Sequence, residues 1–245
     1  MPSSRPSATI SPIAADLGRP DTPSGKGHWP AAWPTARSIT SRTLRTVHRL
    51  SAIVLGAFLV SHIANHLTAL GGVAAHGAFM DAARVVYRWP PVETLLLASA
   101  VVQALSGLAL AWRARRRRGV WTRLQIVSGA CLAFFLLAHV SAILFIRHEL
   151  ALDTNFYAAA MVLTVGVLPF IYAPYYGMGV LALFVHAACA VRNRVGQKRG
   201  TRPARALIGG GALVAVVIVA AHAGWLYEVD LPAPYRAAAE SYLPW

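Results

Sequence analysis

The chain has 245 residues, of which 56% are hydrophobic and only 13% are charged, whereas about a quarter of the residues in soluble globular proteins are charged. This composition excludes an ordinary soluble domain and favours an integral membrane protein. The net charge of +14 does not predict a nucleic-acid partner, because the basic residues lie at the ends of alternate hydrophobic segments rather than in one basic domain.

Residues 1–36 are rich in proline and serine and contain almost no apolar run. Such a segment cannot bury enough apolar surface to offset the entropy lost when a chain becomes ordered. We therefore expect a disordered N-terminal arm on the cytoplasmic side of the membrane.

Five later stretches lack charged residues and are long enough to cross a bilayer core of about 30 Å, which takes about 20 helical residues. They are residues 50–70, 94–112, 124–146, 170–191 and 206–227. They predict membrane-spanning helices at about residues 48–70, 92–113, 123–147, 170–191 and 205–227. The expected fold is an all-α integral membrane bundle of five transmembrane helices over residues 37–230, followed by an outer C-terminal tail at 231–245.

Two connections between the spans, residues 77–88 and 154–168, mix apolar and polar positions at near-helical spacing, and each ends at a proline. Both are expected to form short helices at the outer membrane interface. The uncharged run from Thr154 to Val191 is longer than one crossing needs, and Pro169 and Pro174 offer places to break it. Only the second half of this run is expected to span.

Clusters of arginine precede the first span, separate the second from the third, and separate the fourth from the fifth. Because cytoplasmic loops of membrane proteins are enriched in Lys and Arg, all three clusters are expected on the cytoplasmic face. The other connections carry most of the acidic residues. The N-terminus is thus predicted inside and the C-terminus outside.

Histidines inside the predicted spans are candidates for function, since an ionisable side chain in a membrane is costly and usually faces the bundle interior. His62 lies 13 residues after Arg49, and His139 lies 16 residues after Arg123, which places both roughly 20–24 Å from the inner face. Two imidazoles at one depth on different helices are what a six-coordinate haem iron requires. They predict a haem b site in the outer half, and a hydrogen bond between helices is the competing interpretation.

A third histidine, His186, lies six residues before Arg192, roughly 9 Å from the inner face. It marks an inner site, whose second ligand would have to come from the second span. The one strongly polar residue deep in that span is Gln103, which is not a usual haem ligand. For His66 and His222 we expect packing or interfacial roles, with a substitute ligand or a proton donor as the alternative.

Several short segments occur in the same order and spacing as in a known family. They are His48-Arg-Leu50, Gly56-Ala-Phe-Leu-Val-Ser-His62, Leu124-Gln-Ile-Val-Ser-Gly129 with His139 ten residues later, and Phe184-Val-His186. From about Leu44 to Tyr227 the chain resembles the single-chain, five-helix, two-haem cytochrome b subunit of bacterial succinate dehydrogenases and fumarate reductases.

The resemblance implies that His62 and His139 are the ligands of an outer haem b and that His186 is one ligand of an inner haem. Gln103 stands where the family has its other inner ligand, which leaves the presence of the second haem open. His48, Arg49 and Ser51 resemble the quinone or haem-propionate contacts of related anchors, and for Arg49 the competing interpretation is a cation that anchors the helix at the inner face.

The family's role implies a non-catalytic, haem-binding membrane anchor in the bacterial inner membrane. Such a subunit passes electrons between flavoprotein and iron–sulfur subunits at the cytoplasmic face and a membrane quinone, menaquinone by resemblance. Two alternatives stay open. One is a free-standing membrane b-type cytochrome, or a ferric or quinone reductase, that has no dehydrogenase partner. The other is a haem-free scaffold or transporter, for which broken helices or inverted repeats at the midplane would be expected.

Overall fold

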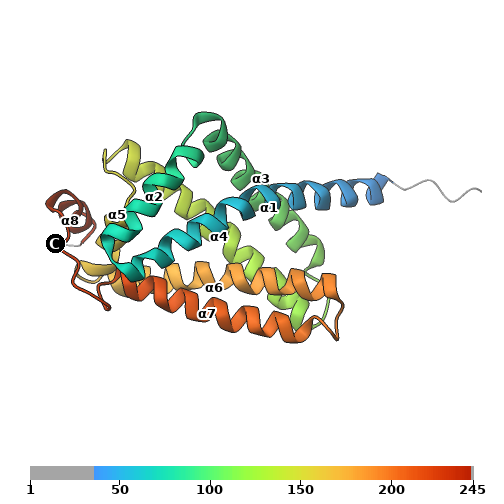
Figure 1. The fold of residues 1–245 in the computed structure, drawn as a ribbon. Coiled ribbons are helices and arrows are strands. Elements are labelled where there is room, and N and C mark those ends of the chain that lie inside the picture. The colour runs from blue at the N-terminus through green and yellow to red at the C-terminus, as the bar shows by residue number, and fades with distance from the viewer. Residues whose placement is uncertain (1–35, 244–245) are drawn as a thin grey trace, which may run out of the picture. The chain divides into compact units, whose positions relative to one another are not determined.

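The structure is a computed structural model that describes residues 36–243, and every regular element in this range is a helix. Five of these helices are long and apolar enough to cross a membrane (Figure 1). They are α1 (Ala36–Thr68), α3 (Pro90–Ala114), α4 (Val120–His148), α6 (Leu168–Val195) and α7 (Thr201–His222). The prediction of an all-α membrane bundle is confirmed, and the chain is a multi-pass membrane protein. Apart from Ala36, the arm predicted at residues 1–36 lies outside the described residues.

The five long helices pack as a ring in which α1 contacts α3, α3 contacts α4, α4 contacts α6, and α6 contacts α7. The ring closes where α7 meets α1 and the short helix η1 (Ala69–Gly71) that follows α1. Glycine allows the closest contacts, because a Cβ added at Gly179 of α6 would overlap the ring of Phe135 of α4. Small residues at such contacts are common between membrane helices.

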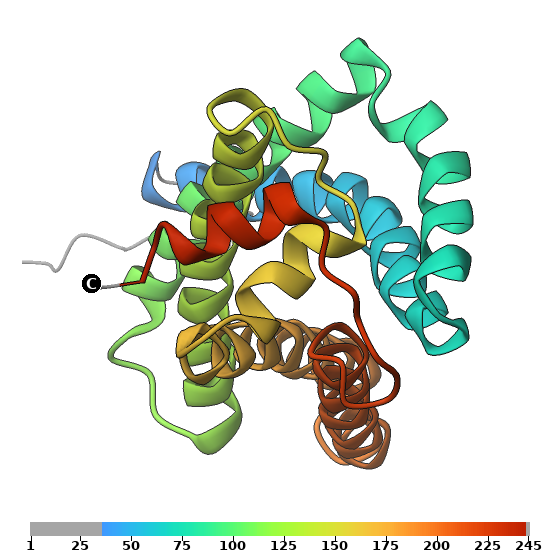
Figure 2. The same ribbon diagram turned by 90° about the vertical axis from the view of Figure 1, so that its left-hand side faces the viewer.

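Three short helices, α2 (Val73–Tyr87), α5 (Phe156–Thr164) and α8 (Ala233–Glu240), lie at the end of the bundle opposite the arginine-rich connections (Figure 1), and this end faces the viewer in Figure 2. The first two correspond to the helices predicted at residues 77–88 and 154–168. The side chain of Asn155 caps α5 by accepting a hydrogen bond from the N–H of Tyr157. The position of these helices at a membrane interface stays a prediction.

The C-terminal segment, for which the sequence predicted an outer tail at residues 231–245, has a helix within the described residues. It contains α8, whose buried Tyr235 packs in one apolar cluster with Phe156 and Met161 of α5. The Tyr235 hydroxyl also donates a hydrogen bond to the backbone carbonyl of Asp153. An eight-residue helix is marginal in isolation, so this packing, which the sequence pattern did not reveal, stabilises it.

Glycines set two of the helix ends. The expected break in the long uncharged run is confirmed, and it falls just before Pro169, where Gly166 adopts φ +52° between α5 and α6. Pro174 lies inside α6 and does not end it. The last long helix ends at His222 rather than near Tyr227, because Gly224 turns the chain with φ +74°. Both φ values belong to the left-handed region that glycine adopts at low cost.

Candidate functional site

A cavity of about 1060 Å³ lies inside the ring of long helices. Residues of all five long helices line it, from Arg45 near the arginine-rich end to Asn155 beside α5. Most binding pockets for small ligands measure ~300–1,000 Å³, so this cavity is large enough for an extended or multiple ligand. Histidine side chains enter it at two levels.

The level nearer the arginine-rich end holds the inner pair, His48 of α1 and His186 of α6. Their ring centroids lie 6.5 Å apart, and the two rings are nearly perpendicular, at 77°. Both side chains are partly buried and line the cavity. The imidazole that faces His186 therefore belongs to the first long helix and not to the second, where Gln103 stands.

A serine on the neighbouring helix fixes the proton position of the His48 ring. Nδ1 of His48 lies 2.9 Å from Oγ of Ser106 on α3. The Ser106 hydroxyl donates its only proton to the carbonyl of Val102, at 2.6 Å, so its oxygen must accept from His48. Nδ1 of His48 thus carries the proton, and Nε2 keeps a lone pair.

His186 is held in the same way by α4. Its Nδ1 lies 3.3 Å from Oγ of Ser128, and the Ser128 hydroxyl donates to the carbonyl of Gln125, also at 3.3 Å. Nδ1 is again the protonated nitrogen, which leaves the Nε2 lone pair free. Histidines that bind metals are usually oriented by such a hydrogen bond from the opposite ring nitrogen.

The residue after each serine is a glycine against which the histidine ring lies. A Cβ added at Gly107 would lie 3.2 Å from Cε1 of His48, and one added at Gly129 would lie 3.1 Å from Cε1 of His186. The dipeptides Ser106-Gly107 and Ser128-Gly129 therefore position the two imidazole rings in the same way. Each serine orients a ring, and each glycine leaves room for it.

Gln103 of α3 lies beside the inner pair as part of a chain of hydrogen bonds. The Ser51 hydroxyl lies 2.6 Å from Oε1 of Gln103, which accepts its proton, and the amide Nε2 of Gln103 lies 3.3 Å from Nε2 of His48. Because His48 Nε2 has the lone pair, the Gln103 amide donates to it. Gln103 thus contacts His48 and does not replace it.

The second level holds the outer pair, His62 of α1 and His139 of α4, whose ring centroids lie 6.1 Å apart at 65°. Aromatic rings support both, since Phe58 stacks on His62 and Phe135 stacks on His139, each with centroids 5.2 Å apart. Tyr176 of α6 meets His139 edge-on at 6.4 Å. Such ring contacts restrict the orientation of the two imidazoles.

One helix therefore contributes to both pairs. His48 and His62 are 14 residues apart, which is close to four turns and ~21 Å along the axis of α1. Both side chains consequently face the cavity from the same side. The distance between the two pairs along the bundle is therefore a large part of the ~30 Å thickness of a bilayer core.

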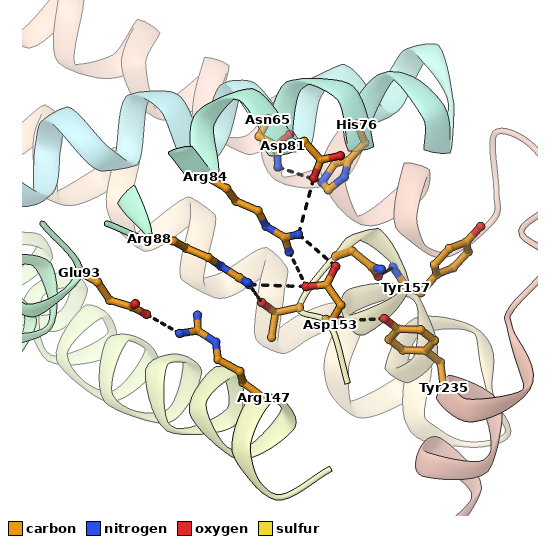
Figure 3. Close-up of polar contacts among 12 residues, drawn as sticks. Asn65, His76, Asp81, Arg84, Arg88, Glu93, Arg147, Asp153, Tyr157 and Tyr235 are labelled. Atoms are coloured by element: carbon orange, nitrogen blue, oxygen red, sulfur yellow. Dashed lines mark hydrogen bonds and ion pairs between the residues drawn. The ribbon is translucent and has the colours of Figure 1, made fainter. Parts of the chain in front are cut away.

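A cluster of polar side chains (Figure 3) lies at the end of the cavity near the outer pair, where Arg88, Glu93 and Arg147 line the cavity. Arg84 binds both carboxylate oxygens of Asp153, at 2.9 and 3.0 Å, and Arg88 donates to the hydroxyl of Thr154 at 2.5 Å. Arg147 forms an ion pair with Glu93. Burial and the charges of Arg84 and Arg147 lower the pKa of Arg88, so an anion beside it would be favourable.

Cations are present at both mouths of the cavity. Arg88 and Arg147 line the end near the outer pair, and the Nε atom of each is buried without a hydrogen-bond partner. Arg45, Arg49 and Arg113 line the other mouth. A ligand with carboxylate groups would find charge-assisted hydrogen-bond donors at either end.

Haem b, the cofactor expected from the sequence, fits both histidine pairs. An imidazole nitrogen binds a metal at ~2 Å and lies ~1 Å from its ring centre, so two imidazoles on opposite sides of one metal ion have centroids ~6 Å apart. The centroid separations of 6.5 Å in the inner pair and 6.1 Å in the outer pair agree with this requirement. His186 has in addition the free Nε2 lone pair that metal binding needs, whereas Nε2 of His48 accepts from the Gln103 amide, which must turn away when His48 binds a metal.

No protein-family model, curated protein or solved structure matches this chain. The roles of the cavity residues therefore rest on their geometry and on the resemblance of the sequence segments.

The structure brings most of the residues singled out in the sequence to one cavity. His62 faces His139, Ser51 and Gln103 join the chain of hydrogen bonds at His48, and Arg49 lies exposed at the arginine-rich mouth. Sequence reasoning expected His48 to contact quinone or propionate and missed that it faces His186. The repeated Ser-Gly dipeptides and the spacing of His48 and His62 were the available signals.

Proposed function

We propose that this chain binds two haem b groups, one held by His48 and His186 and the other by His62 and His139, and conducts electrons across the membrane. The observation that carries the proposal is the presence of two imidazole pairs in one cavity, with centroids 6.5 and 6.1 Å apart. Haem iron bound in such a site takes up and releases one electron at a time.

The residues around the pairs act on the histidines and not on a substrate. Ser106 and Ser128 keep the inner rings in the tautomer that presents Nε2, and the apolar wall keeps water away from the ring nitrogens. Arg88 and Arg147 at one mouth, and the arginines at the other, neutralise carboxylates of bound groups. In this proposal the chain is accordingly an electron-transfer subunit.

The partners follow from the resemblance to the membrane anchors of succinate dehydrogenases and fumarate reductases. In this proposal flavoprotein and iron–sulfur subunits dock on the arginine-rich face, which is cytoplasmic by the positive-inside rule. The chain exchanges their electrons with a quinone, menaquinone by resemblance, in the bacterial inner membrane. The N-terminus is then inside, the C-terminus is outside, and α2 and α5 lie near the outer interface.

A free-standing membrane b-type cytochrome is the second candidate, and one observation favours it. The side chain that faces His186 is His48 of the first long helix, whereas the resembled family places the other inner ligand on the second. This different ligand arrangement fits a cytochrome outside that family. Purification of the untagged complex under mild conditions separates the candidates, because flavin and iron–sulfur subunits accompany an anchor and not a free-standing cytochrome.

A reduced-minus-oxidised spectrum of the purified protein tests haem binding. We expect a b-type spectrum that loses the contribution of one haem in His139→Ala. His148→Ala is the matched control, because His148 is an exposed histidine near the end of the same helix. A protein without haem, or a His139→Ala spectrum like that of the control, contradicts the proposal.

A further inference from the structure

Three more histidines meet beside the outer pair: His66 of α1, His76 of α2 and His222 of α7. Each offers one ring nitrogen, and these three atoms all lie within 4.8 Å of one another. His76 is only 2% exposed and His222 only 1%. Imidazoles brought this close from three separate elements in a buried place form a set of nitrogen donors typical of transition-metal sites.

The hydrogen bonds of His222 leave a lone pair that points toward the cluster. Its Nδ1 lies 2.9 Å from the carbonyl of Ile218 and must donate a proton to it. Nε2 therefore keeps its lone pair, and it lies 3.3 Å from Nδ1 of His66. Two nitrogens bound to one tetrahedral metal ion at ~2 Å are ~3.3 Å apart, so this spacing already suits a shared ion.

His76 has a buried ring nitrogen that no protein group satisfies. Its Nε2 lies 3.2 Å from the side-chain amide of Asn65 (Figure 3), and Nδ1 of His76 and Oδ1 of Asn65 are both buried without a hydrogen-bond partner. With the amide turned over, Oδ1 accepts a proton from Nε2 of His76, and Nδ1 keeps the lone pair that a metal ion needs. Phe156 covers the group, since it stacks on His222 at 4.6 Å and meets His76 edge-on at 5.4 Å. A buried nitrogen without a partner in such a group is accounted for if it binds an ion.

We infer that His66, His76 and His222 form a binding site for a divalent transition metal ion of the zinc type. This site shares no ligand with the outer haem pair but adjoins it, because Nε2 of His66 lies 3.3 Å from Nε2 of His62. The site offers three neutral imidazoles, which suit Zn²⁺ better than Mg²⁺ or Ca²⁺. All three residues also line the cavity, which leaves a fourth position for water. The hydrogen bond from His222 to Ile218 orients that ligand as in other metal sites.

Zinc binding to the full-length protein tests this inference. The protein, purified in detergent without a histidine tag and stripped with a chelator, is dialysed against buffered zinc, and zinc per polypeptide is measured by elemental analysis. We expect one zinc per chain for the wild type and for His148→Gln, in which an exposed histidine is replaced. In His76→Gln we expect the affinity for zinc to fall by ~100-fold or more.

A second measurement does not depend on any variant. X-ray absorption at the zinc edge of the wild type should show three imidazole nitrogens at ~2 Å. Equal zinc affinity in wild type and His76→Gln, or a zinc shell without imidazoles, would overturn the inference. Iron and haem are measured on the same samples, so a protein with haem and no zinc refutes this site alone, and one with zinc and no haem refutes only the proposed function.

Discussion

His48 and His186 face each other across the cavity with ring centroids 6.5 Å apart, although they belong to the first and fourth long helices. Equivalent serines hold the Nδ1 atoms of the two rings. The inner half of the bundle therefore has a pair of imidazoles, although Gln103 stands at the position where the sequence left the second inner ligand open.

Replacing His48 should remove the inner haem, and replacing Gln103 should not. We expect His48→Ala to bind one haem per chain, because only His186 would remain at the inner level. Gln103→Leu should keep both haems and change only the midpoint potential of one, since its amide contacts Nε2 of His48. Haem content and a redox titration measure both effects. If Gln103→Leu lost the inner haem and His48→Ala kept it, Gln103 and not His48 would be the residue that binds the inner haem.

The serines that orient the inner rings should affect affinity for haem without abolishing binding. Ser106→Ala and Ser128→Ala each remove the acceptor for a ring Nδ1–H, and loss of such a contact typically weakens metal binding ~10–100-fold. Haem retention during dilution should fall in both variants. Ser99→Ala, which replaces another buried serine of α3, should retain haem like the wild type, and equal losses in all three would indicate a general packing effect.

A side chain at the glycine beside His186 should disturb the inner haem. In Gly129→Ala the new methyl group would lie 3.1 Å from Cε1 of His186, so the ring must shift by a few tenths of an ångström. We expect a lower inner-haem content and a shifted potential. Gly209→Ala is the control, because a Cβ there meets nothing within 4 Å and should stabilise α7 by up to about 1 kcal/mol. Normal haem content in Gly129→Ala would show that the contact is not needed.

The ion pair between Arg84 and Asp153 should give a pH-dependent contribution to stability. Burial acts to raise the pKa of Asp153, but hydrogen bonds from Arg84 and the charges of Arg84 and Arg88 outweigh it and lower the pKa. The stabilisation is therefore complete above the unfolded pKa of ~3.9 and is lost as the pH falls through the lower folded pKa. Because Asp153 is 45% exposed, solvent screening limits the contribution to about 1 kcal/mol or less.

Thermal unfolding of Asp153→Asn in detergent checks this contribution. We expect the Tm difference from the wild type to be constant above pH ~5 and to shrink below pH ~4. Asp230→Asn, which replaces another exposed carboxylate near the same end, should show no such dependence. Tyr235 contacts only the backbone carbonyl of Asp153, so its ionisation plays no part in this pH range. A Tm difference that grows on acidification would contradict a lowered pKa of Asp153.

The sequence was sufficient for the number and positions of the long helices, because each apolar run matches the bilayer thickness. The depth of a histidine could also be inferred, since helix rise is constant, and His62 and His139 do lie at one level. The partner of His186 could not be inferred, because it depends on how helices pack side by side. The position of His48 along α1 places it at the inner mouth of the cavity. That its side chain faces His186 depends on the packing of the long helices in a ring.

The same limit applies to contacts made by short elements. α8 and α5 are stabilised by contacts between segments distant in sequence, such as Tyr235 with Tyr157, and such contacts leave no periodic pattern. His76 lies in α2, outside the membrane-spanning helices, so the hydropathy pattern did not indicate it as a candidate functional histidine. Its approach to His66 and His222 follows from the fold of α2 against α1.

The number of haem b groups per polypeptide tests the central claim most directly. It is measured by alkaline pyridine haemochrome and protein quantification on the purified wild type and on His186→Ala. The two imidazole pairs predict two haems per chain in the wild type and one in His186→Ala. A wild-type protein with no haem, or with a single haem that His186→Ala retains, would contradict the account.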